Sequence, residues 1–195
     1  MNKHHKDNNI TVEMAALEDI PGIIAVLEEN LLINKDRSVI GDLEQGGFLI
    51  ARHSVEDLHD WIEDKENHIV MVYKEAQKII GYILGCNLSV LSSEMQTKIA
   101  EIQLLRDISA TNLVLYHKQI AIKPNQKGVG SKLLQSFFDF AVMKGCHHIV
   151  CFIVHEPILN KVSIGFHQKH GFECVGLVQI EDLKDGVYLK KLRTN

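Results

Sequence analysis

Two glycines followed by an amphipathic pattern mark the stretch of this chain best suited to binding an anion. Residues 119–131 read QIAIKPNQKGVGS, in which an alternating apolar run leads to Gly128 and Gly130 and then to apolar residues at helical spacing. Glycine lets the backbone turn tightly, and the first N–H groups of a helix have no partner within the helix. With the helix dipole, these N–H groups form a site for an anion, most naturally a phosphate.

The glycine spacing excludes two common phosphate loops. A Walker loop would need Gly, four residues and then Gly-Lys-Ser/Thr, and a dinucleotide fingerprint would need a third glycine where Leu133 stands. An ordinary strand-to-helix turn remains open for this loop taken alone. A second stretch with chemical potential is residues 160–172, NKVSIGFHQKHGF, because His167 at its centre can exchange a proton near neutral pH.

Both stretches resemble motifs of the GNAT superfamily of acyl-CoA-dependent N-acyltransferases. NQKGVG resembles its pyrophosphate loop, Gln/Arg-x-x-Gly-x-Gly/Ala, although Asn125 stands in the first position unless Gln126 takes that role. The second stretch resembles Asn-x-x-Ala/Ser-x-x-x-Tyr/His-x-x-x-Gly-Phe. Five residues match it: Asn160, Ser163, His167, Gly171 and Phe172. With His in place of the usual Tyr, the chain is most similar to the phosphinothricin-acetyltransferase-like members.

This resemblance implies an N-acetyltransferase that takes acetyl-CoA as its acyl donor. The expected acceptor is a primary amine of a small molecule or an amino-acid-like compound, which attacks the thioester directly. The backbone of the fourth strand would hold pantetheine, and an N–H there would hold the oxyanion of the tetrahedral intermediate. The expected cofactor-binding residues are Ile120, Ala121 and Ile122 on the strand, Gln126, Lys127, Gly128, Val129, Gly130 and Ser131 in the loop, and Asn160 for the pantetheine arm.

Proton transfer has two candidate residues within this resemblance. His167 stands where the family has a Tyr that protonates the leaving thiolate, and a His with a pKa near 6.5 can do so. A packing role for His167 remains open. The amine must also lose a proton, and Glu156 is the preferred base, directly or through a water. Three other residues near the expected cleft are alternatives: Tyr116, His117 and Gln119.

Two further functions stay open beside the small-molecule enzyme. The first is a non-catalytic acyl-CoA-binding module, which Asn125 and the absence of the usual Tyr would suit. The second is a protein N-acetyltransferase, for which a broad open groove is expected. Release of the CoA thiol in the presence of an amine separates the enzymes from the binding module.

Composition sets the remaining expectations. The 195 residues are 46% hydrophobic, which suits a single domain over residues 10–195 behind a disordered polar tail over residues 1–9. A net charge of −4 gives no reason to expect a nucleic acid partner. No apolar run is long enough to span a membrane, so we expect a cytoplasmic protein, in which a homodimer is possible.

No metal site is expected from the cysteines and histidines. Cys86, Cys146, Cys151 and Cys174 occur singly, so we expect reduced and mostly buried thiols. The adjacent histidines at 4–5 and 147–148 would point to opposite faces of a strand, which does not suit a shared metal ion.

Hydrophobic periodicity predicts the elements that position these residues. The expected fold is α/β (α+β) and GNAT-like, with a mixed twisted sheet of about seven strands and helices on both faces. Strands are predicted at 10–14, 69–73, 79–84, 113–122, 149–154, 172–180 and 186–192, and helices at 20–31, 54–62, 92–108, 129–145 and 160–171. The 92–108 helix is an insertion between the third and fourth strands. It could cover the acceptor site, mediate dimerisation or extend the core. The glycine-punctuated segment 34–52 either borders the acceptor pocket or is a packed connector.

Overall fold

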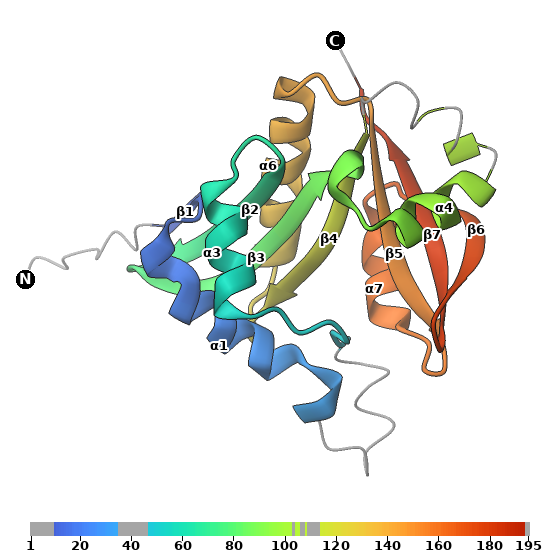
Figure 1. Ribbon diagram of the computed structural model, residues 1–195. Coiled ribbons are helices and arrows are strands. Elements are labelled where there is room, and N and C mark those ends of the chain that lie inside the picture. The colour runs from blue at the N-terminus through green and yellow to red at the C-terminus, as the bar shows by residue number, and fades with distance from the viewer. Residues whose placement is uncertain (1–9, 35–46, 103, 106–107, 109–113, 194–195) are drawn as a thin grey trace, which may run out of the picture.

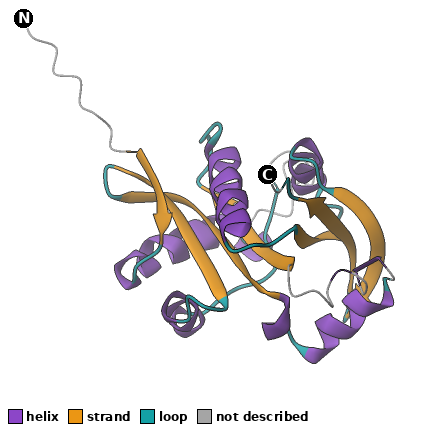
Figure 2. Ribbon diagram, turned by 90° about the horizontal axis from the view of Figure 1, so that it is seen from above, coloured by secondary structure: helices purple, strands orange, loops and turns teal. Residues whose placement is uncertain are grey.

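A single mixed sheet runs through the molecule, with helices on both faces (Figures 1 and 2). The computed structural model describes residues 10–34, 47–102, 104–105, 108 and 114–193. The strands are β1 (Ile10–Met14), β2 (His68–Glu75), β3 (Lys78–Asn87), β4 (Val114–Ile122), β5 (His148–Glu156), β6 (Glu173–Ile180) and β7 (Leu183–Lys191). They lie in the order β1-β2-β3-β4-β5-β7-β6, and only the β4–β5 pair is parallel. The predicted fold class is confirmed, whereas the predicted tail at residues 1–9 lies outside the described residues.

The helices follow the predicted apolar stripes and capping signals. They are α1 (Ile20–Asn30), α3 (Val55–Glu63), α4 (Ser93–Glu101), α6 (Val129–Met143) and α7 (Lys161–Lys169). The capping box of α3 is present, because Ser54 N donates to Asp57 Oδ2 at 2.8 Å and Asp57 N donates to Ser54 Oγ at 3.0 Å. No helix in the described part of the chain is both long and apolar enough to cross a bilayer.

The inserted helix is shorter than predicted. α4 ends at Glu101, because Ile102 leaves the helical conformation with φ −87° and ψ 107°. A Cβ atom at Gly176 of β6 would lie 2.7 Å from Ile102 Cδ1, so the Ile102 side chain packs directly on the β6 backbone. The apolar spacing that predicted one helix to residue 108 therefore continues across a break in the backbone. Residues 103, 106–107 and 109–113 of this segment lie outside the described residues.

The connection between the last two strands also differs from the prediction. The polar run 181–185 was expected to be a loop, but β7 already begins at Leu183, and only Glu181 and Asp182 form the turn. The pairing of β7 with both β5 and β6 extends to Asp185, which lies opposite Val154 and Val178. Charged residues at 182, 184 and 185 concealed this strand, because they break the apolar alternation.

The central pair of strands separates along its length. β4 pairs with β5 only where Val114–Tyr116 meet His148–Val150, and beyond that point the two strands diverge (Figure 1). The register between β3 and β4 shifts after Gly85–His117, and the next pair is Leu84–Gln119. Lys118 is therefore an extra residue in β4, and a bulge of this kind bends a strand.

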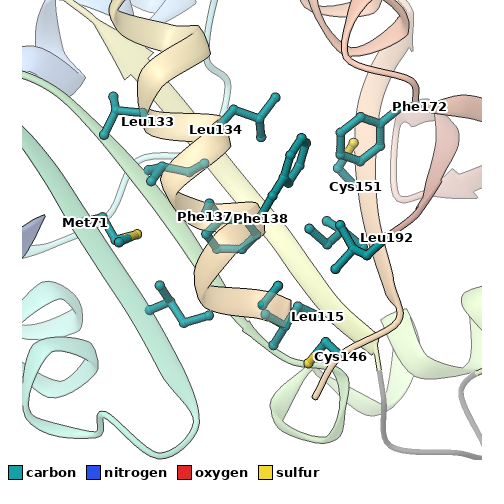
Figure 3. Close-up of a cluster of buried hydrophobic side chains, with 14 of the residues drawn as sticks. Met71, Leu115, Leu133, Leu134, Phe137, Phe138, Cys146, Cys151, Phe172 and Leu192 are labelled. Carbon is teal, nitrogen blue, oxygen red and sulfur yellow. The ribbon is translucent and has the colours of Figure 1, made fainter. Parts of the chain in front are cut away.

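Helix α6 holds the two arms of the sheet together. Its residues Leu133, Leu134, Phe137 and Phe138 project into the core between Met71 of β2 on one side and β5 with its neighbours on the other (Figure 3). Phe137 is completely buried, and a Cβ atom at Gly85 would lie 2.5 Å from its ring. Because side chains in such a core are closely packed, α6 fixes the angle at which β4 and β5 open.

Candidate active site

A cavity of about 480 Å³ lies along the diverging parts of β4 and β5. Its walls are formed by residues 116–122 of β4, 151–154 of β5, the segment 47–51 and one face of α7. This volume is within the range of small-molecule sites. The segment 47–51 therefore borders the cavity, whereas residues 35–46 of the predicted 34–52 segment lie outside the described residues.

The predicted phosphate loop lies at the N-terminus of α6, where the two glycines have different reasons for being glycine. Gly128 is the N-cap with φ +80°, and a Cβ atom there would meet nothing within 4 Å. At Gly130 a Cβ atom would lie 2.7 Å from Ile122 Cδ1 and 3.3 Å from the Phe166 ring. Gly128 thus serves the turn and leaves open space beside the first helical N–H groups, while Gly130 allows close packing.

The open edge of β4 presents alternate residues to the cavity. Lys123 N donates to Ile80 O at 2.8 Å, so the main chain of Lys123 faces β3. In an antiparallel pair this direction alternates, so Ala121 also faces β3, while Ile120 and Ile122 face the opening. The Ile122 carbonyl accepts a hydrogen bond from Asn30 Nδ2 at 3.1 Å. Of the three residues predicted to hold pantetheine, Ile120 therefore has its main-chain groups free toward the cavity, whereas the main chain of Ala121 is turned to β3.

Asn160 lines the cavity with both ends of its side chain already engaged. Its Oδ1 accepts from Ser163 N at 3.2 Å, which caps α7, and its Nδ2 donates to Phe48 O at 2.9 Å. Asn160 thus joins α7 to the 47–51 segment. The structure gives this residue a positioning role beside its predicted contact with pantetheine.

His167 is buried in the cavity wall against a second histidine. Its Nδ1 lies 2.7 Å from the Ser163 carbonyl, which can only accept, so the proton of the neutral ring is on Nδ1. His167 Nε2 is then an acceptor, and it lies 3.3 Å from Nδ1 of His117. Burial lowers the pKa of His167 to about 4, an effect that the Ser163 carbonyl opposes and His170 reinforces. Burial, with His167 adding to it, also lowers the pKa of His117 well below its usual value.

The other predicted proton-transfer residues fall into two groups. Glu156 is exposed, pairs with Lys184 Nζ at 2.8 Å, and is not among the residues that line the cavity. Tyr116, His117 and Gln119 do line it. Gln119 is fully engaged, because Oε1 accepts from Tyr82 at 2.6 Å and Nε2 donates to the Ala51 carbonyl at 3.1 Å. Burial raises the pKa of Tyr116, so this phenol stays protonated at neutral pH.

One charged residue of the cavity was missed by the sequence reading. Asp185 lines the cavity with only 7% of its surface exposed, and its Oδ1 has no hydrogen-bond partner in the described part of the chain. Burial raises its pKa above the usual value, and nearby His155 offsets this only in part. The two-residue period of a strand could have revealed it, since Asp185 shares a face with the buried Val187.

The inserted helix reaches the cavity from the same side. Met95 of α4 and Leu91 just before it are lining residues, and both pack into the cluster of apolar residues between α4 and β6–β7. Of the three roles left open for this insertion, the structure thus shows that it covers part of the cavity wall and extends the core.

Three buried side chains could in principle bind a soft metal ion. Cys151, His117 and His167 place one ligand atom each within 4.8 Å of the others. The two imidazoles are, however, hydrogen bonded to each other, and burial raises the pKa of the Cys151 thiol. A metal ion would have to break this hydrogen bond and remove the thiol proton, so the expectation of no metal remains a prediction. All four cysteines are free, and Cys174 alone among them is exposed.

Comparison with known proteins identifies the family. The model of the acetyltransferase (GNAT) family matches residues 40–172. The chain belongs to this family. No protein of curated function matches it significantly.

Solved GNAT structures share the fold at low sequence identity. An N-acetyltransferase from Staphylococcus aureus Mu50 has a TM-score of 0.64 and 20% identity, over 95% of this chain and 99% of that one. The PaiA N-acetyltransferase from Thermoplasma acidophilum, in complex with coenzyme A, has a TM-score of 0.64 and 16% identity, over 94% and 99%. A phosphinothricin N-acetyltransferase-like protein has a TM-score of 0.62 and 18% identity, over 95% and 99%. The predicted family, including its similarity to the phosphinothricin type, is confirmed.

Proposed function

We propose that this GNAT protein transfers the acetyl group of acetyl-CoA to the primary amine of a small acceptor by direct attack. The observation that carries the proposal is the cavity between the diverging strands, with the free edge of β4 along one wall and the N-terminus of α6 beside it. Coenzyme A bound to a structural relative in the same family supports the choice of donor.

The residues around the α6 N-terminus fit the phosphates of such a donor. Acetyl-CoA supplies an acetyl group activated as a thioester. The N–H groups from Gln126 to Ser131 would hold its pyrophosphate, because the turn at Gly128 leaves open space beside them. Lys127 is exposed next to this turn and adds a positive charge. The main chain of Ile120 would pair with the pantetheine arm as a neighbouring strand does.

The same strand edge can stabilise the negative charge that develops on the thioester oxygen. A main-chain N–H that is held by the sheet needs no reorganisation when that charge appears, and a donor of this kind is typically worth about 2.7–4 kcal/mol. The amine must also arrive without its extra proton. Of the predicted bases, His117 and Tyr116 line the cavity, and Glu156 would need a water to reach it.

A small acceptor is favoured over a protein by the shape of the site. Met95 and Leu91 of the insertion form part of the cavity wall opposite α7, where a protein acceptor would need an open groove. The insertion therefore limits the length of what can enter beside the thioester.

A non-catalytic acyl-CoA-binding module is the second candidate, and one observation favours it. In its neutral form His167 carries its proton toward Ser163, and its other nitrogen is occupied by His117. A ring in this state has no proton to give to a thiolate. Binding without turnover is the behaviour that this arrangement would produce.

The deciding experiment combines CoA release with binding on one preparation. We expect a panel of primary amines to include acceptors that release CoA continuously from acetyl-CoA. We also expect acetyl-CoA to raise the melting temperature, by the equivalent of about 2.7 kcal/mol at a hundredfold excess over Kd. A thermal shift without CoA release from any amine would support the binding module, and the absence of both would contradict both candidates.

A further inference from the structure

Asp185 places a carboxylate in an otherwise apolar end of the cavity. It projects from β7 between Val154 and Val178 on the neighbouring strands, and its Oδ1 is buried without a hydrogen-bond partner in the described residues. Burying a carboxylate without a partner is unfavourable for folding. Such a cost is common at sites that bind a ligand, because the ligand supplies the missing partner.

The charged groups around Asp185 leave it available to a ligand. His155 is the ionisable neighbour that acts on it, and the His155 ring is hydrogen bonded to the Tyr188 hydroxyl at 3.1 Å. Lys118 is the positively charged side chain among the described lining residues, but its Nζ lies 3.9 Å from the centre of the Trp61 ring. Lys118 is thus held by a cation–π contact at α3, and no ion pair with Asp185 is formed.

We propose that Asp185 binds the ammonium group of the acceptor and that the acceptor is a compact cation with an apolar body. This inference rests on the proposed acetyl transfer, whose acceptor it specifies. An ammonium donates to carboxylate oxygens and supplies the partner that Oδ1 lacks. The uncharged part of the acceptor would contact the apolar side chains at the same end of the cavity, which are Leu91, Met95, Phe152 and Ile180.

The apolar walls also define what the site should reject. An amino acid would bring a carboxylate close to Asp185, and a polyamine would bury a second ammonium among apolar side chains, which is costly without a partner. A primary amine on an alkyl or arylalkyl group satisfies both the carboxylate and the walls.

The test compares two compounds of the same shape and different charge. One is 2-phenylethylamine, a cation at neutral pH, and the other is O-benzylhydroxylamine, whose nitrogen is uncharged there. We expect Asp185→Asn to lower the ratio of their kcat/KM values by about tenfold to a hundredfold, the size of a hydrogen bond to a charged group. The control is Asp182→Asn, which removes the same charge from the exposed turn of the same hairpin and should leave the ratio unchanged.

Two further measurements separate this inference from the proposed function. Calorimetric titration of both compounds into the wild-type protein in the presence of CoA needs no turnover, and tighter binding of the cation, lost in Asp185→Asn, supports the inference even if no CoA is released. The melting temperature of Asp185→Asn should stay level or rise, because the variant removes an unpaired buried charge. Equal affinity of the wild type for the two compounds, or an unchanged preference in Asp185→Asn, would overturn the inference. A lower melting temperature with unchanged preference would show that Asp185 is structural.

Discussion

At the scale of single residues, the decisive question is whether His167 delivers a proton. Its neutral form points Nδ1–H at Ser163 and offers only a lone pair toward His117. To act as a general acid, His167 must first gain a proton, and burial makes this unfavourable, with a pKa of about 4. A catalytic His167 would therefore need a nearby source of protons in the bound complex, and the amine itself is such a source.

Substitution of His167 distinguishes proton transfer from packing. If it donates the proton, His167→Phe should keep its affinity for acetyl-CoA and lose turnover by about 10²–10⁴-fold. His167→Tyr restores the hydroxyl that the family usually has and should keep part of the rate. Steady-state rates, acetyl-CoA affinity and melting temperature would be measured on each variant. Wild-type turnover in His167→Phe would refute the assignment, and a parallel loss of stability and affinity in both variants would indicate a packing role.

The residues of the site differ in how visible they are in the sequence. Gly128, His167 and Asn160 could be selected because fixed motif spacing brought them together, and the structure places all three around one cavity or its mouth. Asp185 belongs to no motif, and its importance depends on a burial that only the pairing of β7 reveals. The unsuitable position of Glu156 was equally hidden, since nothing in the sequence shows that it pairs with Lys184 on the surface.

At the scale of elements, helix α6 offers a matched test of the phosphate site. Gly128 and Gly145 lie at its two ends, with φ values of +80° and +79°, and a Cβ atom at either would meet nothing within 4 Å. Changing either to Glu adds the same charge and a similar backbone strain, about 1–2 kcal/mol for a side chain in the left-handed region. Only Gly128→Glu, however, places its carboxylate beside the helical N–H groups.

We expect both glycine variants to lose similar stability and only one to lose the cofactor. Thermal unfolding would measure the first effect, and titration with acetyl-CoA the second, with Gly128→Glu binding at least tenfold more weakly, as the loss of a charged hydrogen bond predicts. Similar affinities for acetyl-CoA in the two variants would mean that the N-terminus of α6 does not bind the pyrophosphate.

Most elements were predictable because each depends on local signals. The stripe of α1, the capping box of α3 and the hairpin of β2 and β3 are all encoded within a few residues. The break of α4 at Ile102 was not, because it depends on packing against Gly176, more than seventy positions away. The start of β7 depends in the same way on its two neighbouring strands.

At the scale of the whole molecule, buried histidines make the fold sensitive to acid. The pKa values of His53 and His167 are lowered from 6.5 to about 4, mainly by burial, and that of His117 is lowered further. In the unfolded chain these rings bind protons below pH 6.5, whereas in the folded protein they remain neutral until much lower pH. The unfolded state therefore binds more protons over this range, and the free energy of unfolding must fall as the pH falls.

The expected size of this effect can be measured by urea unfolding between pH 7.5 and 4.5. Each buried histidine contributes a slope of up to about 1.4 kcal/mol per pH unit below pH 6.5. Asp185 acts in the opposite sense, because its pKa is raised in the folded state, but it is one group against three. In His167→Phe one of the three is removed, so we expect a shallower decline than in the wild type. A free energy of unfolding that stays constant from pH 6.5 to 5 would show that these rings are solvated and that the cavity wall is more open than the structure indicates.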